Sequence, residues 1–300
     1  MSDYHIPVLL NESIEGLNIR PGGIYVDATY GGGGHSEAIL KQLKTGELYA
    51  FDQDEDARRN LPHQKKFFFI QGNFRFLGNY LKYYGVSRID GLIADLGVSS
   101  HQFDEYGRGF TYRSNAELDM RMNRKAKLTA ELVINSYEAA ELSALFRNYA
   151  ELEQPHKLAS AIVGEREKNR IVSVNQLIGC IEHLVPKHAF NKYISRVFQA
   201  LRIEVNRELD NLRDMLNSAG TLLNNNGRLV VISYHSLEDR IVKNFMRWGN
   251  PDKEPESDLY GHRPVPFRII TRKPVTACEA EVNANPRARS AKLRIAEKQL

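Results

Sequence analysis

Alternating apolar and polar stretches predict a parallel sheet with crossover helices in the first third of the chain. Short apolar, β-prone runs are separated by segments whose apolar residues recur at helical spacing, such as Ala38, Ile39 and Leu43. Strand, helix and strand in this rhythm are typical of a doubly wound α/β sheet. The strands are expected at 25–29, 47–52, 66–70 and 89–95.

This rhythm stops after the fourth strand. From about Glu105 to Asn206 the pattern is helical, with helices expected at 130–135, 139–147, 156–168, 174–183 and from 193 onward. The sheet resumes at 227–233, a continuous apolar run typical of a strand buried on both faces. A helix at 237–248 and strands at 267–271 and 292–296 follow. We therefore expect a discontinuous sheet domain, 1–104 with 207–300, and an inserted helical domain, 105–206.

Local capping patterns mark three helix starts. Asn11 is a good N-cap for a short helix near the N-terminus. Ser236, with Asp239 three positions later, resembles a capping arrangement for the helix at 237–248. Asp52 is placed to cap a helix at 55–61.

Four consecutive glycines, Gly31 to Gly34, join the first strand to the following helix. Glycine lets the backbone approach a ligand closely, and a helix start presents free N–H groups to an anion. A Gly-x-Gly-x-x-Gly dinucleotide fingerprint counted from Gly31 needs glycine at position 36, where the chain has Ser36. The Val-Asp-Ala-Thr strand end at 26–29 instead resembles motif I of class I S-adenosylmethionine (SAM) methyltransferases. A tight turn without a ligand is the alternative.

Acidic and aromatic residues follow the strands next to this loop. Asp52 lies 21 residues after Gly31, where a nucleotide-binding sheet places the carboxylate that accepts ribose hydroxyls. Asp95 ends the fourth strand, beyond which ligands bind in this topology. Phe74 follows the third strand, where an aromatic ring either contacts an adenine or packs in the core.

Composition narrows the class of protein. Three hundred residues, 42% of them hydrophobic, are enough for a large core. Cys180 and Cys278 have no ligand-spaced partners, so neither a disulfide framework nor a metal site is expected. A polar N-terminus and the lack of any long apolar run indicate a cytoplasmic protein.

Charge is distributed unevenly along the chain. The segment from His262 to Leu300 has nine Lys/Arg against three Asp/Glu, whereas the rest is nearly neutral. A basic tail favours a polyanionic partner such as nucleic acid. A solvated basic end that only aids solubility is the alternative.

Several motifs resemble one family in order along almost the whole chain. The most specific are Ser-Tyr-His-Ser-Leu-Glu-Asp-Arg at 233–240 and Asn-Pro-Arg-Ala-Arg-Ser-Ala-Lys at 285–292. The others lie at 5–10, 27–36, 95–100, 108–113 and 198–206. Together they resemble the bacterial 16S rRNA (cytosine-N4-)methyltransferases of the RsmH (MraW) type. Tyr234 stands where that family usually has Phe, and Phe103 where it usually has Leu.

The resemblance implies a SAM-dependent enzyme that methylates N4 of a cytidine in the decoding region of 16S rRNA. It implies a Rossmann-like sheet with an all-α domain inserted for substrate recognition, the small ribosomal subunit as partner, and a possible homodimer. Carried over position by position, the cofactor contacts are Gly33, Gly34, His35, Asp52, Phe74, Asp95 and Gln102. His35 and Gln102 rest on the resemblance alone.

The chemistry of such a reaction points to three candidate catalytic residues. The amino nitrogen of cytosine is a poor nucleophile, and an acceptor for its protons assists attack in line with the leaving group. Asp95, or a backbone carbonyl within 96–99, is the candidate acceptor, and Asp95 binding only the cofactor is the alternative. His235 and Ser236 follow the fifth strand and are predicted to orient the base, with helix capping as the alternative.

Basic residues predict two RNA-binding stretches. Arginines that alternate with Phe110 and Tyr112 offer phosphate contacts and stacking platforms, and the target base must leave its stack to reach the site. The predicted contacts are Arg108, Arg113 and Arg121 in the first stretch and Arg287, Arg289 and Lys292 in the tail. A solvent-exposed charged face is the alternative.

Three other functions remain open at this point. A SAM enzyme acting on a small molecule or protein would share the glycine loop but leave the basic tail unexplained. A non-enzymatic RNA-binding protein would not need an intact loop with both Asp52 and Asp95. A dinucleotide-dependent oxidoreductase is weakened by Ser36.

Overall fold

The computed structural model describes residues 7–99, 103, 105–256 and 265–299. The chain divides into two compact units, the sheet unit (1–97 with 209–300) and the helical unit (98–208). The boundaries expected from the sequence lie close by, at 104/105 and 206/207.

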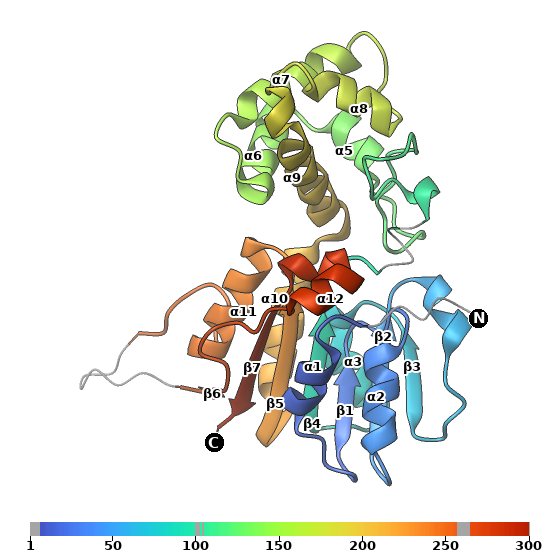
Figure 1. The fold of residues 1–300 in the computed structure, drawn as a ribbon, viewed down its shortest axis with the longest axis vertical. Coiled ribbons are helices and arrows are strands. Elements are labelled where there is room, and N and C mark those ends of the chain that lie inside the picture. The colour runs from blue at the N-terminus through green and yellow to red at the C-terminus, as the bar shows by residue number, and fades with distance from the viewer. Residues whose placement is uncertain (1–6, 100–102, 104, 257–264, 300) are drawn as a thin grey trace. The chain divides into compact units, whose positions relative to one another are not determined.

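Seven strands of the described chain form one mixed sheet in the order β3-β2-β1-β4-β5-β7-β6 (Figure 1). Neighbours from β3 through β5 run parallel, and β7 is antiparallel to both β5 and β6. This arrangement confirms the predicted class I SAM methyltransferase fold, a Rossmann-like sheet with a helical insert. The strands are β1 (Ile24–Asp27), β2 (Glu47–Asp52), β3 (Phe67–Gln71), β4 (Ile89–Asp95), β5 (Leu223–Ser233), β6 (Phe267–Ile269) and β7 (Lys292–Lys298).

Helices cover both faces of this sheet. On one face α1 and α2 pack against a core that includes Ile93, Val230 and Leu293 (Figure 1). α10 and α11 lie side by side, with Gly220 of α10 facing the ring of Phe245 of α11. The helices and short 3₁₀ turns of the sheet unit are α1 (Leu10–Leu17), α2 (Gly34–Gln42), η1 (Glu55–Asn60), η2 (Phe74–Phe76), α3 (Leu77–Tyr83), α10 (Glu208–Leu222), α11 (Ser236–Trp248), α12 (Glu279–Ala284) and η4 (Pro286–Ser290).

The expected cap of the first helix is wrong. α1 begins at Leu10, and Leu9, with φ 50°, holds the N-cap position, so Asn11 lies inside the helix. The amide of Leu9 donates to Oε1 of Glu281 at 2.7 Å. The carboxylate of Glu281, near the other end of the sequence, therefore accepts the hydrogen bond at the start of α1. Capping patterns use only neighbouring residues, so they could not predict this partner.

The helical unit has a hydrophobic core of its own, built around residues such as Phe146, Leu158 and Val197. Asn206, at the end of α9, accepts from the amide of Met122 at 2.7 Å and donates to the carbonyl of Met120 at 2.8 Å. These two bonds hold the loop before α5 against the end of α9. The elements whose bounds the structure describes in this unit are η3 (Tyr106–Arg108), α5 (Ala130–Ser136), α6 (Ala139–Ala150), α7 (Pro155–Arg166), α8 (Val174–Ile181) and α9 (Lys187–Asn206).

The helices of the described chain lack the combined length and apolar character that crossing a membrane requires.

Candidate cofactor and catalytic site

Three neighbouring parallel strands each end in an aspartate. Asp27 is the last residue of β1, Asp52 of β2 and Asp95 of β4. Because β2, β1 and β4 are adjacent and parallel, these side chains lie at one edge of the sheet. The predicted strand ends at Asp52 and Asp95 are confirmed, and Asp27 is a third carboxylate that the sequence analysis did not single out.

The glycine loop connects to this acidic edge. The amide of Gly31 donates to Oδ2 of Asp52 at 2.8 Å, and the amide of Asp54 donates to Oδ1 of the same carboxylate. The cap of η1 is Asp54, not Asp52, so the capping alternative for Asp52 is wrong. Asp52 instead ties the end of β2 to the loop after β1.

The glycines differ in why they must be glycine. Gly33 has φ +84°, and a Cβ there would lie 2.6 Å from the hydroxyl of Tyr30. A Cβ on Gly34 would overlap the ring of Pro7, whereas one on Gly32 would meet nothing within 4 Å. Gly33 and Gly34 are therefore needed for packing, and Gly32 faces open space where a ligand has room.

Burial raises the pKa values of the aspartates. Asp27 is 1% exposed, and desolvation raises its pKa to about 6, although Ser36 donates to it at 2.7 Å. Desolvation raises the pKa of Asp52 to about 6 and that of Asp95 to about 7. Carboxylates held close together away from water favour a cationic ligand, which would stabilise their ionised forms.

His35 lies at the second position of α2, buried beneath the N-terminal segment. Desolvation lowers its pKa to about 4, opposed by a hydrogen bond to the backbone of Val8, so the ring is neutral at pH 7. Its Nε2 is buried without a hydrogen-bond partner among the described residues. Phe74 opens η2 directly after β3 and is half-buried. Gln102 lies outside the described residues.

The turn after β5 brings further side chains to the acidic edge. Tyr234 donates its hydroxyl hydrogen bond to Oδ1 of Asp95 at 2.7 Å. His235 is the N-cap of α11, and Glu238 completes the capping box by accepting from the amide of His235. The predicted cap, Ser236 with Asp239, is wrong by one position: the residues that cap α11 are His235 and Glu238. The carboxylate of Asp239 instead pairs with Arg294 at 2.7 Å.

The predicted catalytic residues thus have different surroundings. Asp95 is half-buried at the strand end, His235 has a side chain only 7% exposed that serves the helix start, and Ser236 is exposed. The capping alternative for His235 is confirmed. Direct contact of His235 or Ser236 with a base stays a prediction.

Two of the arginines predicted to bind RNA are used internally. Arg108 is 5% exposed and donates to the carbonyls of Arg121 and Met122 at 2.7 and 3.0 Å. Arg121 forms a two-point pair with Asp119 and donates to the carbonyls of Arg124 and Ala126. The two guanidinium groups thus hold the loop together, and their contact with RNA stays a prediction.

The remaining basic residues lie nearer to solvent. Arg113 and Arg289 are exposed, Arg287 is half-buried, and Lys292 lies 3.8 Å from a carboxylate oxygen of Asp239. Contact of these four residues with RNA stays a prediction.

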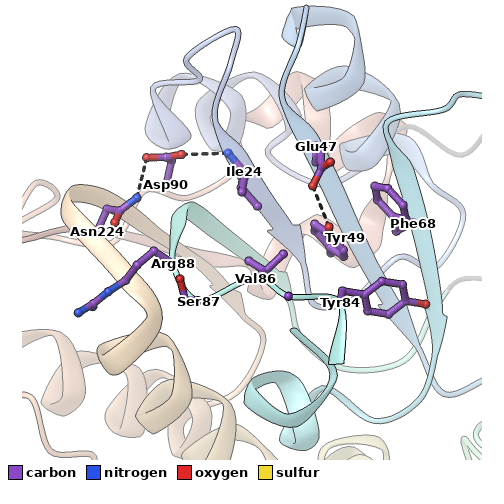
Figure 2. A pocket seen from close by; sticks show the side chains of 11 residues that line it. Ile24, Glu47, Tyr49, Phe68, Tyr84, Val86, Ser87, Arg88, Asp90 and Asn224 are labelled. Atoms are coloured by element: carbon purple, nitrogen blue, oxygen red, sulfur yellow. Dashed lines mark hydrogen bonds between the residues drawn. The ribbon is translucent and has the colours of Figure 1, made fainter. Parts of the chain in front are cut away.

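The opposite edge of the sheet has a surface hollow of about 540 Å³ (Figure 2). Its carboxylates serve the strands themselves: Asp90 accepts from the amide of Ile24 at 2.9 Å and from the side chain of Asn224 at 3.1 Å. Glu47 accepts from the hydroxyl of Tyr49 at 2.8 Å. Both oxygens of Asp90 are thus paired, and the hollow lies at the amino ends of the strands, away from the glycine loop.

Comparison with known proteins adds to this geometry. The model of the MraW methylase family matches residues 2–299. The chain belongs to this family. Ribosomal RNA small subunit methyltransferase H of Phocaeicola vulgatus is 52% identical over 98% of this chain and 97% of its own length. The protein of the same name from Parabacteroides distasonis is also 52% identical, over 99% of this chain and 98% of its own.

Among solved structures, an rRNA methylase from Streptococcus thermophilus aligns with 97% of this chain and 94% of its own, at 14% identity. Its TM-score is 0.38, and this likeness supports no argument about the present chain.

Membership of the MraW methylase family excludes the oxidoreductase alternative.

The acidic edge fits the cofactor of such a methylase. SAM carries a sulfonium and an ammonium group, whose charges are complementary to carboxylates, and two ribose hydroxyls, which need acceptors of the kind that Asp52 provides. The open space beside Gly32 and the unpaired Nε2 of His35 leave room and one polar partner for a bound group. The sequence analysis did not name Asp27 or the hydroxyl of Tyr234 as parts of the site. The Val-Asp-Ala-Thr motif contains Asp27 and was the signal that could have identified it.

Proposed function

We propose that this protein transfers a methyl group from SAM to N4 of a cytidine in the decoding region of small-subunit rRNA. The observation that carries the proposal is the set of three strand-end carboxylates around an open glycine loop, in a chain of the MraW methylase family. The name of the two relatives, ribosomal RNA small subunit methyltransferase H, supports the class of substrate.

Residues of the sheet unit hold the cofactor in this proposal. Asp52 accepts from the ribose hydroxyls, Phe74 lies against the adenine, and the loop of Gly33, Gly34 and His35 contacts the remainder, together with Gln102. When bound, SAM supplies a methyl group attached to a positively charged leaving group.

Asp95 acts on the acceptor base. Its carboxylate accepts a hydrogen bond from the amino group of the cytosine, which favours the pyramidal nitrogen needed for attack and takes up the developing positive charge. The amino nitrogen forms the new bond to carbon as the bond to the leaving group breaks, and the surplus proton leaves through Asp95 to solvent. His235 and Ser236 border the base from the turn after β5.

A substitution separates catalysis from cofactor binding at this residue. Asp95→Ala should lower the single-turnover rate of rRNA methylation by at least about tenfold, while the Kd for SAM measured by calorimetry changes far less. A large loss of SAM affinity with an unchanged single-turnover rate at saturating SAM would instead assign Asp95 to the cofactor.

The helical unit and the basic tail recognise the RNA in this proposal, with the exposed Arg113 and Arg289 as the main phosphate contacts and Arg287 and Lys292 beside them. Arg289→Glu should weaken rRNA binding and lower its salt dependence. Lys82→Glu, an exposed charge change on α3, is the matched control. Equal binding by both variants would remove Arg289 from the RNA surface.

The reaction itself has a direct test. Small subunits from cells that lack the modification are incubated with the protein and methyl-labelled SAM, and the rRNA is digested for mass spectrometry. The proposal expects one N4-methylcytidine in the decoding region; a label on small molecules or protein would overturn it. Cytoplasmic location and a homodimer stay part of the proposal, and sedimentation of the purified protein tests the second.

A further inference from the structure

Tyr234 is fixed at three points where β5 ends. Its amide donates to Oε2 of Glu238 at 2.9 Å, and its hydroxyl donates to Oδ1 of Asp95 at 2.7 Å. Its ring lies over Gly97, where a Cβ would be 3.7 Å from the ring carbon Cδ2. The phenol therefore sits against the end of β4 in a defined orientation.

The hydrogen bond from Tyr234 determines what Asp95 offers to a ligand. The amide of Asp95 donates to Oγ1 of Thr29 at 2.6 Å, which anchors its backbone to the loop after β1. Oδ1 is occupied by the tyrosine, and Oδ2 makes no hydrogen bond to a described residue. Rotation of the carboxylate would break the bond to Tyr234, so Oδ2 is the oxygen left to accept from a ligand.

The surroundings of this pair are negative. Burial and the nearby carboxylates of Asp27 and Glu238 all raise the pKa of Asp95, and the hydroxyl of Tyr234 is the group that lowers it. Burial, Asp95, Glu238 and Glu281 in turn raise the pKa of Tyr234, so the phenol keeps its proton and acts only as a donor. Without that donor, the ionised form of Asp95 would lose its one stabilising neighbour among these groups.

We propose that Tyr234 is a positioning residue for methyl transfer: its hydroxyl holds Oδ1 of Asp95 and leaves Oδ2 directed at the amino group of the substrate base. The proposal rests on the function proposed above and adds a residue to it. The RsmH family usually has phenylalanine at this position. Its ring fills the same space but has no hydroxyl to donate a hydrogen bond to Asp95.

The first test compares two substitutions that each remove one hydroxyl. Tyr234→Phe should move the acid limb of the single-turnover rate upward by about one pH unit, so that the rate below it falls about tenfold while the plateau at high pH is kept. Tyr49→Phe removes a hydroxyl bonded to Glu47 at the opposite edge of the sheet and should leave the profile unchanged. An unshifted acid limb in Tyr234→Phe, or an equal shift in both variants, would overturn the proposal.

The second test needs no substrate. The carboxyl carbons of aspartate are labelled with ¹³C, the Asp95 signal is assigned by its loss in Asp95→Asn, and its titration is followed by NMR. The midpoint should be about one unit higher in Tyr234→Phe than in the wild-type protein. If the wild-type protein fails to methylate rRNA, the proposed function is wrong and this titration still decides whether Tyr234 controls Asp95; equal midpoints would overturn that control.

Discussion

The two edges of the sheet use the same side chains for different purposes. At the amino edge, Asp90 and Glu47 have partners that hold the starts of the strands together, and one of these partners is a tyrosine hydroxyl (Figure 2). At the carboxyl edge, Asp95 accepts from a tyrosine hydroxyl through Oδ1 alone, whereas both oxygens of Asp90 are bonded. The second oxygen of Asp95 has no hydrogen bond within the described chain.

The difference agrees with the general behaviour of parallel sheets, in which ligands bind at the carboxyl ends of the strands and not at the amino ends. Loops that leave the carboxyl ends of the strands diverge and leave space there, which is where open α/β sheets bind ligands. The amino edge has a hollow of about 540 Å³, yet both carboxylate oxygens of Asp90 are already paired there. A free acceptor oxygen beside an open loop, such as Oδ2 of Asp95, is therefore a better guide to a ligand site than the size of a hollow.

The largest effect is expected from removing the carboxylate that contacts the glycine loop. Asp52→Ala should weaken SAM binding by roughly 10- to 100-fold, the range expected for hydrogen bonds to a charged group. Glu47→Gln, at the other end of the same strand, should leave the affinity within about twofold. Calorimetric titration of both variants measures this, and equal losses would erase the distinction between the two edges.

A smaller effect should separate two glycines of one loop. Gly34→Ala forces a Cβ against Pro7, and overpacking of this kind costs about 1–3 kcal/mol, or roughly 2–4 °C in Tm per kcal/mol for a chain of this size class. Gly32→Ala meets no neighbour and should keep its Tm while binding SAM more weakly. Thermal melts with and without SAM distinguish them; a lowered Tm in Gly32→Ala alone would contradict the packing argument.

The smallest effect concerns pH. Folding raises the pKa of Asp27 and Asp52 to about 6 and that of Asp95 to about 7, so the folded chain holds these protons more tightly than the unfolded chain does. Their contribution to stability is complete below about pH 4 and is lost as the pH rises through about 7. A cationic ligand favours the ionised forms, so its binding should strengthen over the same interval.

The matched control for this prediction is S-adenosylhomocysteine, which lacks the sulfonium charge. The rise in Tm caused by SAM should grow between pH 5.5 and pH 7.5 more than the rise caused by the control ligand. Parallel curves for the two ligands would mean that the carboxylates do not respond to the sulfonium.

Sequence periodicity predicted the central strands well because β1, β2 and β4 are largely buried and each ends at an aspartate. Asp52 and Asp95 were found in this way, and the structure places both at one edge. Caps were predicted less well: His235 replaces Ser236, and Leu9 with Glu281 replaces Asn11. Several side chains near each helix start can bond to it, and packing selects among them.

Charge in the sequence does not show how the arginines of the loop before α5 are bonded. Arg108 and Arg121 have the residue type expected for RNA binding, but backbone carbonyls and Asp119 occupy their guanidinium groups. The sequence shows that a cation is present, and only the folded loop shows whether its donors are already used. The same limit hid the bond between Tyr234 and Asp95, whose partners lie 139 positions apart.

The hydrogen bond between Leu9 and Glu281 has a consequence for biosynthesis. The two residues are 272 positions apart, and Pro7, two residues before Leu9, packs on Gly34 of the glycine loop. During translation, the amide of Leu9 lacks this acceptor until Glu281 has been synthesised. The segment from Pro7 to Leu9, which packs on the glycine loop, therefore gains this hydrogen bond only near the end of translation.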